Sequence, residues 1–143
     1  MVNLGLKNKK IILETKNKLI IDLKNNKNGY LFSKNYTKFI DKQIKEIVSA
    51  LDTSEVEFTL IAVGGYGRED VAPFSDIDLL LIYKKQNKFI KNLISQLNNT
   101  LWDSGLDIGI SYLTIKQAIS DSKQDIKTLT KFLESRYLFG STD

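Results

Sequence analysis

Several residue types are missing or scarce in this sequence. Cysteine and histidine are absent, and the only arginines are Arg68 and Arg136. These absences exclude disulfides, thiolate metal sites and any imidazole base or ligand. No apolar run approaches the roughly 18 residues of a membrane helix, and no apolar N-terminal run with a small-residue cleavage site marks export. We therefore expect a cytoplasmic protein whose chemistry depends on carboxylates, hydroxyls, lysines, the two arginines or a bound metal ion.

The composition is that of one globular domain, with 143 residues of which 42% are hydrophobic and 27% charged. Charge is distributed unevenly, because residues 1–50 have a net charge of +7 and residues 51–143 a net charge of −3. The lysines of the first part alternate with asparagine and aliphatic residues, without the arginine and aromatic side chains typical of nucleic-acid binding. This pattern favours a solvated helical face over a nucleic-acid site.

Hydrophobic spacing predicts a helical segment over residues 1–54. Its first helix is expected to end near Asn26, where asparagine and glycine act as helix stop signals. A second helix is expected over residues 36–51, capped by Ser33 or Asn35.

The rest of the chain, residues 55–143, alternates between strand and helix patterns and predicts an α+β core with a small mixed sheet flanked by helices. Trp102 is expected in this core, on the apolar face of its helix. The expected strands cover residues 58–63, 77–83 and 106–113, and the expected helices cover 87–104, 115–121 and 126–139.

Two acidic residues on the second expected strand are the main indication of chemistry. Asp76 and Asp78 are two residues apart, so their side chains leave the same face of the sheet. Like charges held side by side need compensation, which a divalent cation supplies. Hard oxygen ligands with open positions suit Mg²⁺. Asp107, on the next expected strand, could complete a two-metal site.

Phosphate-binding groups are expected beside these acids. Gly64 and Gly65 follow the first expected strand, and glycine lets the backbone of a tight turn approach a triphosphate closely. Ser75 offers a hydroxyl to the same phosphates. Arg68 is either a phosphate ligand or a surface arginine, and the sequence leaves both open. Tyr66 is expected to pack, and Arg136 to reach another element.

The order of strand, Gly-Gly turn, Asp-x-Asp strand, helix and acidic strand resembles the polymerase beta-like nucleotidyltransferase superfamily. The longer string AVGGYGREDVAPFSDIDLLLIY, with LWDSGLDIGISYLT downstream, is similar to the N-terminal nucleotidyltransferase domain of bacterial PII uridylyltransferases. This resemblance covers about residues 55–140. It implies phosphate-turn positions for Gly64 and Gly65, and metal-ligand positions for Asp76, Asp78 and Asp107.

The sequence departs from the family pattern at two places. Gly67-Arg68-Glu69-Asp70 stands where the family usually has Gly-Arg-Gly-Glu, so we expect a more acidic and less flexible turn. Gly109-Ile110-Ser111 stands where the family usually has Gly-His-Ser. Family chains continue into a histidine-rich hydrolase domain and two ligand-sensing domains. A sequence without histidine cannot contain that hydrolase, so we expect either an excised domain or a shortened natural homologue.

The resemblance implies a Mg²⁺-dependent transfer of UMP from UTP to a tyrosine of a PII-type signalling protein, with release of pyrophosphate, in nitrogen regulation. One alternative is a truncated, catalytically weak module that binds nucleotide or a partner protein. Another is a nucleotidyltransferase with a different acceptor, such as a small molecule or an RNA end. Base selectivity, the acceptor and the oligomeric state are not determined by the sequence.

Overall fold

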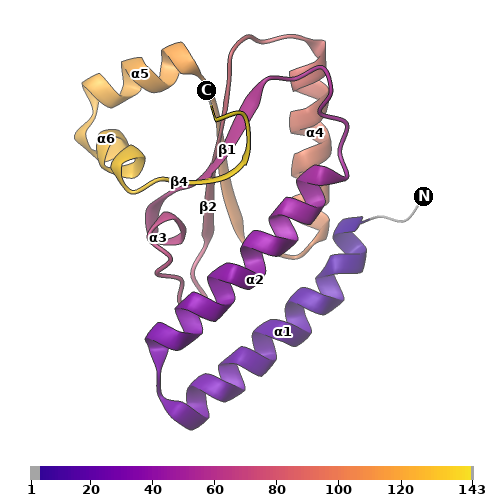
Figure 1. The fold of residues 1–143 in the computed structure, drawn as a ribbon, viewed down its shortest axis with the longest axis vertical. Helices are drawn as coiled ribbons and strands as arrows, with labels where there is room; N and C mark the ends of the chain where they lie inside the picture. Colours follow the sequence, from indigo (N-terminus) through magenta and orange to yellow (C-terminus); the bar gives the residue numbers. More distant parts are fainter. Residues whose placement is uncertain (1–3, 143) are drawn as a thin grey trace.

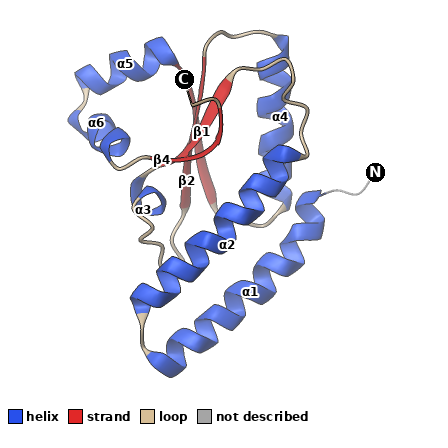
Figure 2. Ribbon diagram, in the orientation of Figure 1, coloured by secondary structure: helices blue, strands red, loops and turns tan. Residues whose placement is uncertain are grey.

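The computed structural model describes residues 4–142, which form six helices and four strands (Figure 1, Figure 2). In chain order the elements are α1 (Leu4–Asn26), α2 (Gly29–Ser49), β1 (Phe58–Ala62), α3 (Gly64–Gly67), β2 (Ile77–Tyr83), α4 (Lys88–Asp103), β3 (Ile108–Thr114), α5 (Ile115–Gln124), α6 (Ile126–Leu133) and β4 (Arg136–Gly140). No helix within residues 4–142 is both long enough and apolar enough to cross a bilayer.

The four strands form one mixed sheet in the order β3-β2-β1-β4. β1 pairs antiparallel with both β2 and β4, and β2 pairs parallel with β3. A parallel pair needs a crossover connection, which α4 provides. The predicted α+β class, with a small mixed sheet flanked by helices, is confirmed.

One face of the sheet forms the hydrophobic core with α2 and α4. Ile77, Leu79 and Leu81 alternate toward this face of β2, as the period of two in a strand requires. Helix α2 covers them with a helical stripe that includes Ile40 and Ile44, both fully buried. The N-terminal helix pair therefore contributes to the same core as the sheet. Helices α5 and α6 lie on the other side of the sheet, away from α4 (Figure 1).

Helix α2 begins earlier than the sequence pattern predicted. Asn28 is its N-cap and accepts a hydrogen bond from the amide of Leu31, so Gly29 is already helical. The expected caps Ser33 and Asn35 lie inside the helix. Capping by asparagine only two residues after the end of α1 makes a tight helical hairpin.

The C-terminal part of the prediction was wrong in two respects. The last helix ends at Leu133, and residues 136–140 form strand β4, which pairs with the free edge of β1. Aromatic residues at 137 and 139 suit such an edge strand, and the pairing of this segment with β1 outweighed its helical spacing.

The prediction for Trp102 was also wrong. Trp102 is 85% exposed and does not belong to the core.

Candidate active site

The two glycines after β1 begin a short helix rather than a simple tight turn. Val63 is extended and donates its amide to the carbonyl of Asp78 (3.0 Å), which joins the end of β1 to β2. Gly64 has φ +59°, a left-handed conformation that glycine adopts without steric cost. Residues Gly64–Gly67 then form the single turn of α3, closed by the amide of Arg68 on the carbonyl of Gly64 (3.1 Å).

The three predicted acids meet at one end of the parallel strand pair. Asp76 and Asp107 immediately precede β2 and β3, and Asp78 lies within β2. The amide of Ile77 donates to the carbonyl of Asp107 (2.8 Å), which fixes the two strand starts side by side. Strand β2 has the expected bounds, whereas β3 begins two residues later than the expected 106–113, so Asp76 and Asp107 both lie one residue before a strand.

Asp76 and Asp107 approach each other closely. Hydrogen bonding with the Asp107 carboxyl, and next the negative charge of that group, raise the pKa of Asp76 above its usual range, and Asp78 adds a smaller effect in the same direction. Both Asp76 and Asp107 are exposed to solvent. Two carboxyls in contact favour a shared proton or a bound cation.

The carboxylate of Asp78 lies between two glycines. A methyl carbon built on Gly64 would stand 3.1 Å from its Oδ2, and one built on Gly109 would stand 2.9 Å from its Oδ1. Gly109 is also the direct partner of Asp78 in the β2–β3 register. Both glycines thus provide the space that the carboxylate occupies.

Gly109 was considered in the sequence only as part of a departure from the family pattern. Its position inside an alternating strand is nevertheless a signal, because glycine in a strand often marks a close approach of another group. The approaching group here is the Asp78 carboxylate.

The fit of this site to a divalent cation depends on its donor set. Three carboxylates supply the hard oxygens that Mg²⁺ prefers, and the contact between Asp76 and Asp107 is one that a cation would relieve. Among residues 4–142, however, no three acidic side chains are already arranged around one point as ligands. The chemistry of the donors therefore fits a metal ion, whereas their present arrangement does not yet form a ligand cage.

Arg68 and Ser75 bond to residues other than the three acids. Nη1 of Arg68 forms an ion pair with Oε2 of Glu134 (2.6 Å), and the Arg68 side chain remains about half exposed. Nη2 of Arg68 is also near Gly65. The hydroxyl of Ser75 accepts the amide of Ala72 (3.1 Å) in the loop before Asp76. The partnership with Glu134 was not predicted, because the two residues are 66 positions apart.

Comparison with known proteins identifies the family. The model for the nucleotidyltransferase domain matches residues 41–135. This chain belongs to the nucleotidyltransferase domain family. The match includes both glycines of the turn and all three acids. The predicted nucleotidyltransferase class and the polymerase beta-like fold are therefore confirmed.

Curated relatives of this nucleotidyltransferase domain carry the name bifunctional uridylyltransferase/uridylyl-removing enzyme. The one from Pseudoalteromonas translucida (strain TAC 125) is 43% identical over 106 residues, which are 73% of this chain and 12% of the relative. The one from Haemophilus influenzae (strain 86-028NP) is 38% identical over 109 residues, which are 75% of this chain and 13% of the relative. The chain thus spans about one eighth of the length of these relatives.

Proposed function

We propose that this nucleotidyltransferase domain transfers UMP from Mg²⁺-bound UTP to a tyrosine hydroxyl of a PII-type signalling protein. The observation that carries the proposal is the Asp78 carboxylate held between Gly64 and Gly109, beside the paired carboxyls of Asp76 and Asp107. The names of the curated relatives support UTP as the donor. The tyrosine acceptor and the role in nitrogen regulation follow from the resemblance to PII uridylyltransferases. UTP is a cytoplasmic metabolite, so the proposed reaction takes place in the cytoplasm.

In this proposal Asp76, Asp78 and Asp107 hold two Mg²⁺ ions. When bound, the ions neutralise charge on the triphosphate and make the α-phosphorus a better electrophile. The amides of Gly64 and Gly65 and the hydroxyl of Ser75 bind phosphate oxygens. Arg68 binds the leaving pyrophosphate after exchanging Glu134 for phosphate, an exchange that costs little because the ion pair is exposed.

The transfer is an in-line displacement. The acceptor oxygen forms a bond to the α-phosphorus, and the bond from that phosphorus to the oxygen shared with the β-phosphate breaks. Asp107 takes the proton of the attacking hydroxyl, since it is the acid farthest from the glycine turn in the strand order. Pyrophosphate leaves with the negative charge, which the turn amides and Arg68 stabilise.

Calorimetric titration of UTP, ATP, CTP and GTP with Mg²⁺ tests the nucleotide site. We expect Mg²⁺-dependent binding that is tightest for UTP and lost in the double variant Asp76→Asn/Asp78→Asn. Asp22→Asn is the matched control, because Asp22 is an exposed carboxylate on α1 and should leave binding unchanged. Binding that survives in the double variant would refute the metal-ligand assignment.

A labelling assay with UTP carrying a labelled α-phosphate tests the transfer. We expect label on a PII-type protein, resistant to nuclease, and no label when its acceptor tyrosine is replaced by phenylalanine. Nucleotide binding without transfer would favour the alternative of a binding module. Label on RNA instead of protein would favour a different acceptor.

A further inference from the structure

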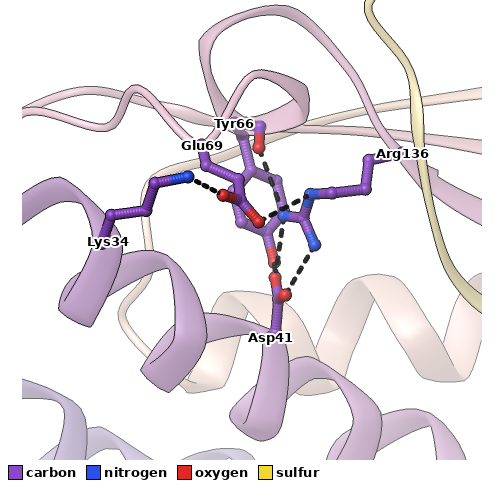
Figure 3. Close-up of polar contacts among 5 residues, drawn as sticks. All are labelled: Lys34, Asp41, Tyr66, Glu69 and Arg136. Carbon is purple, nitrogen blue, oxygen red and sulfur yellow. Dashed lines mark hydrogen bonds and ion pairs between the residues drawn. The ribbon is translucent and has the colours of Figure 1, made fainter.

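A group of five polar side chains gathers around Tyr66 of α3, and none of the three acids belongs to it (Figure 3). We call it the Arg136 cluster. Its members come from three parts of the chain that are far apart in sequence: α2, α3 with the loop after it, and the first residue of β4. The residues of the cluster are Lys34, Asp41, Tyr66, Glu69 and Arg136.

Arg136 joins α2 to the glycine turn. Its Nη1 donates to Oδ2 of Asp41 (2.6 Å), and its Nη2 donates both to Oδ1 of Asp41 (3.0 Å) and to the backbone carbonyl of Tyr66 (3.3 Å). The hydroxyl of Tyr66 donates to the same Asp41 oxygen that Nη2 contacts (2.6 Å). The guanidinium also lies over the Tyr66 ring, 5.3 Å from its centroid. One planar group thus contacts the side chain and the backbone of the residue at the centre of α3.

These contacts are partly shielded from water. Tyr66 is 1% exposed, and the side chains of Arg136 and Asp41 are 24% and 17% exposed. The pKa of Tyr66 is raised, first by burial and then by the charge of Asp41, so its hydroxyl remains a donor. Deleting one partner of a partly buried ion pair is costly, because the other charge is left without its partner where solvent compensates it only in part.

Close packing around Gly67 also restricts the movement of the glycine turn. A carbon atom built on Gly67 would stand only 2.2 Å from the carbonyl oxygen of Glu134 and 3.0 Å from that of Ala62. The end of α3 is therefore wedged between the end of β1 and the residues that lead into β4. Arg136, at the start of β4, also contacts α3, through the carbonyl of Tyr66.

Glu69 shows that the loop after α3 is held under strain. It has φ +60°, a conformation that is rare for a residue other than glycine. Lys34 of α2 donates to its carboxylate, and Nε of Arg136 lies 3.9 Å from its other oxygen. That Nε is buried and has no hydrogen-bond partner within the described part of the chain. A strained residue persists where its surroundings fix it, and here two cations do so.

We propose that Arg136 is a positioning residue for the triphosphate: it holds the carbonyl of Tyr66, and with it the amides of the glycine turn, in the geometry that binds phosphate. Its bond to Asp41 fixes that geometry relative to helix α2. The role in catalysis rests on the function proposed above, whereas the role in holding the turn does not.

The shape of the guanidinium makes this more than a contribution to stability. A planar group with several donors in a fixed fork sets both distance and angle between Asp41 and Tyr66, which a lysine ammonium cannot do. Arg136→Lys keeps the positive charge for Asp41 and removes the fork. This variant therefore separates positioning from simple charge compensation.

Hydrogen exchange measured by mass spectrometry tests the holding of the turn without any nucleotide. We expect Arg136→Lys to speed exchange of the bonded amides of residues 67–70 by about tenfold, with α4 unchanged. The control is Lys84→Met, which removes an exposed ion pair with Glu57. Tyr66→Phe deletes only the hydroxyl and should give a smaller increase, which keeps the test informative if an Arg136 variant folds poorly. Exchange at the wild-type rate in both cluster variants would overturn the proposal.

Mg²⁺-UTP titration of the same proteins tests the consequence for the substrate. We expect Arg136→Lys to weaken binding about tenfold while Lys84→Met binds as the wild type. Faster exchange at the turn with unchanged affinity would overturn the positioning role and leave a structural one. Wild-type protein that binds no nucleotide would refute the proposed function, and the exchange result would then decide alone whether Arg136 holds the turn.

Discussion

The two faces of the sheet differ in how they are covered. The face toward α2 and α4 is closed, with Leu60 and Leu81 fully buried. On the opposite face, Asp78 and Ile82 of β2 are only half-buried. An apolar groove of about 640 Å³ runs between this open face and helices α5 and α6. The closed face makes the fold stable, and the open face leaves room at one end for charged groups and a ligand.

Shortening a side chain on the closed face should have the largest effect on stability. Leu81→Ala removes a fully buried side chain next to α2 and α4, and such changes cost about 2–5 kcal/mol. Denaturant unfolding measures the free energy. Ile82→Ala, one residue further on the open face, is the matched control and should cost clearly less. Equal costs at the two positions would show that the faces do not differ.

Adding one carbon on the open face should damage the site and spare the fold. Gly109→Ala places a methyl group 2.9 Å from Oδ1 of Asp78, so the carboxylate must move. We expect Mg²⁺-UTP affinity to fall at least about tenfold, equivalent to ~1.4 kcal/mol, with little change in unfolding free energy. Calorimetry and denaturant unfolding of one protein preparation measure both.

Gly29→Ala is the matched control for this change. Nothing lies within 4 Å of a carbon built on Gly29, at the start of α2. Nucleotide affinity should remain that of the wild type. Unchanged affinity in Gly109→Ala would mean that the Asp78 carboxylate does not need its present position.

The closed face was the part of the fold that could be predicted best from the sequence. Periods of two in β2 and of 3.6 in α4 identify which residues face inward, because burial of apolar area is the largest favourable term. The meeting of the two glycines with the acids was predicted on a different ground, namely their spacing along consecutive elements of the chain. Whether they bind metal and phosphate stays a prediction.

Long-range partnerships were beyond the sequence. Arg136 was expected to reach another element, and it does, but Asp41 is 95 positions away and nothing local identifies it. Strand β4 was missed because its sequence also fits a helical repeat and its stability comes from the edge of β1. Trp102 was misplaced because it directly follows Leu101, the last buried residue of α4, and one residue further along a helix points about 100° away from the buried face.

The ion pair between Lys34 and Glu69 should give a smaller, pH-dependent effect. The hydrogen bond from Lys34 lowers the pKa of Glu69 below its usual value near 4.5, and the same bond raises the pKa of Lys34 above 10.5. A lowered acid pKa stabilises the fold above pH 4.5 and a raised lysine pKa does so below pH 10.5. The contribution of the pair is therefore fully present between these limits, and it is lost progressively as the pH falls through the lowered pKa of Glu69 or rises through the raised pKa of Lys34.

Thermal unfolding from pH 2 to 8 measures this contribution. The melting temperature of the wild type should exceed that of Glu69→Gln by no more than a few degrees at neutral pH, and the difference should vanish as the pH falls below 4.5. Glu57→Gln, which breaks the exposed pair with Lys84, serves as the control. If the difference in melting temperature between the wild type and Glu69→Gln did not change with pH, the Lys34–Glu69 ion pair would not be its cause.

The smallest effect is expected on helix α6, which borders the open face. Leu133 is 78% exposed, so Leu133→Ser removes almost no contact and should change the unfolding free energy by less than about 0.5 kcal/mol. Leu138→Ser, on the neighbouring strand β4, is the matched control, since Leu138 is 2% exposed and its loss should be severe. Denaturant unfolding at two protein concentrations shows whether any loss of stability depends on contact between molecules. A large, concentration-dependent loss in Leu133→Ser would mean that the open face is covered in solution, because only contact with another molecule can make an exposed leucine stabilising.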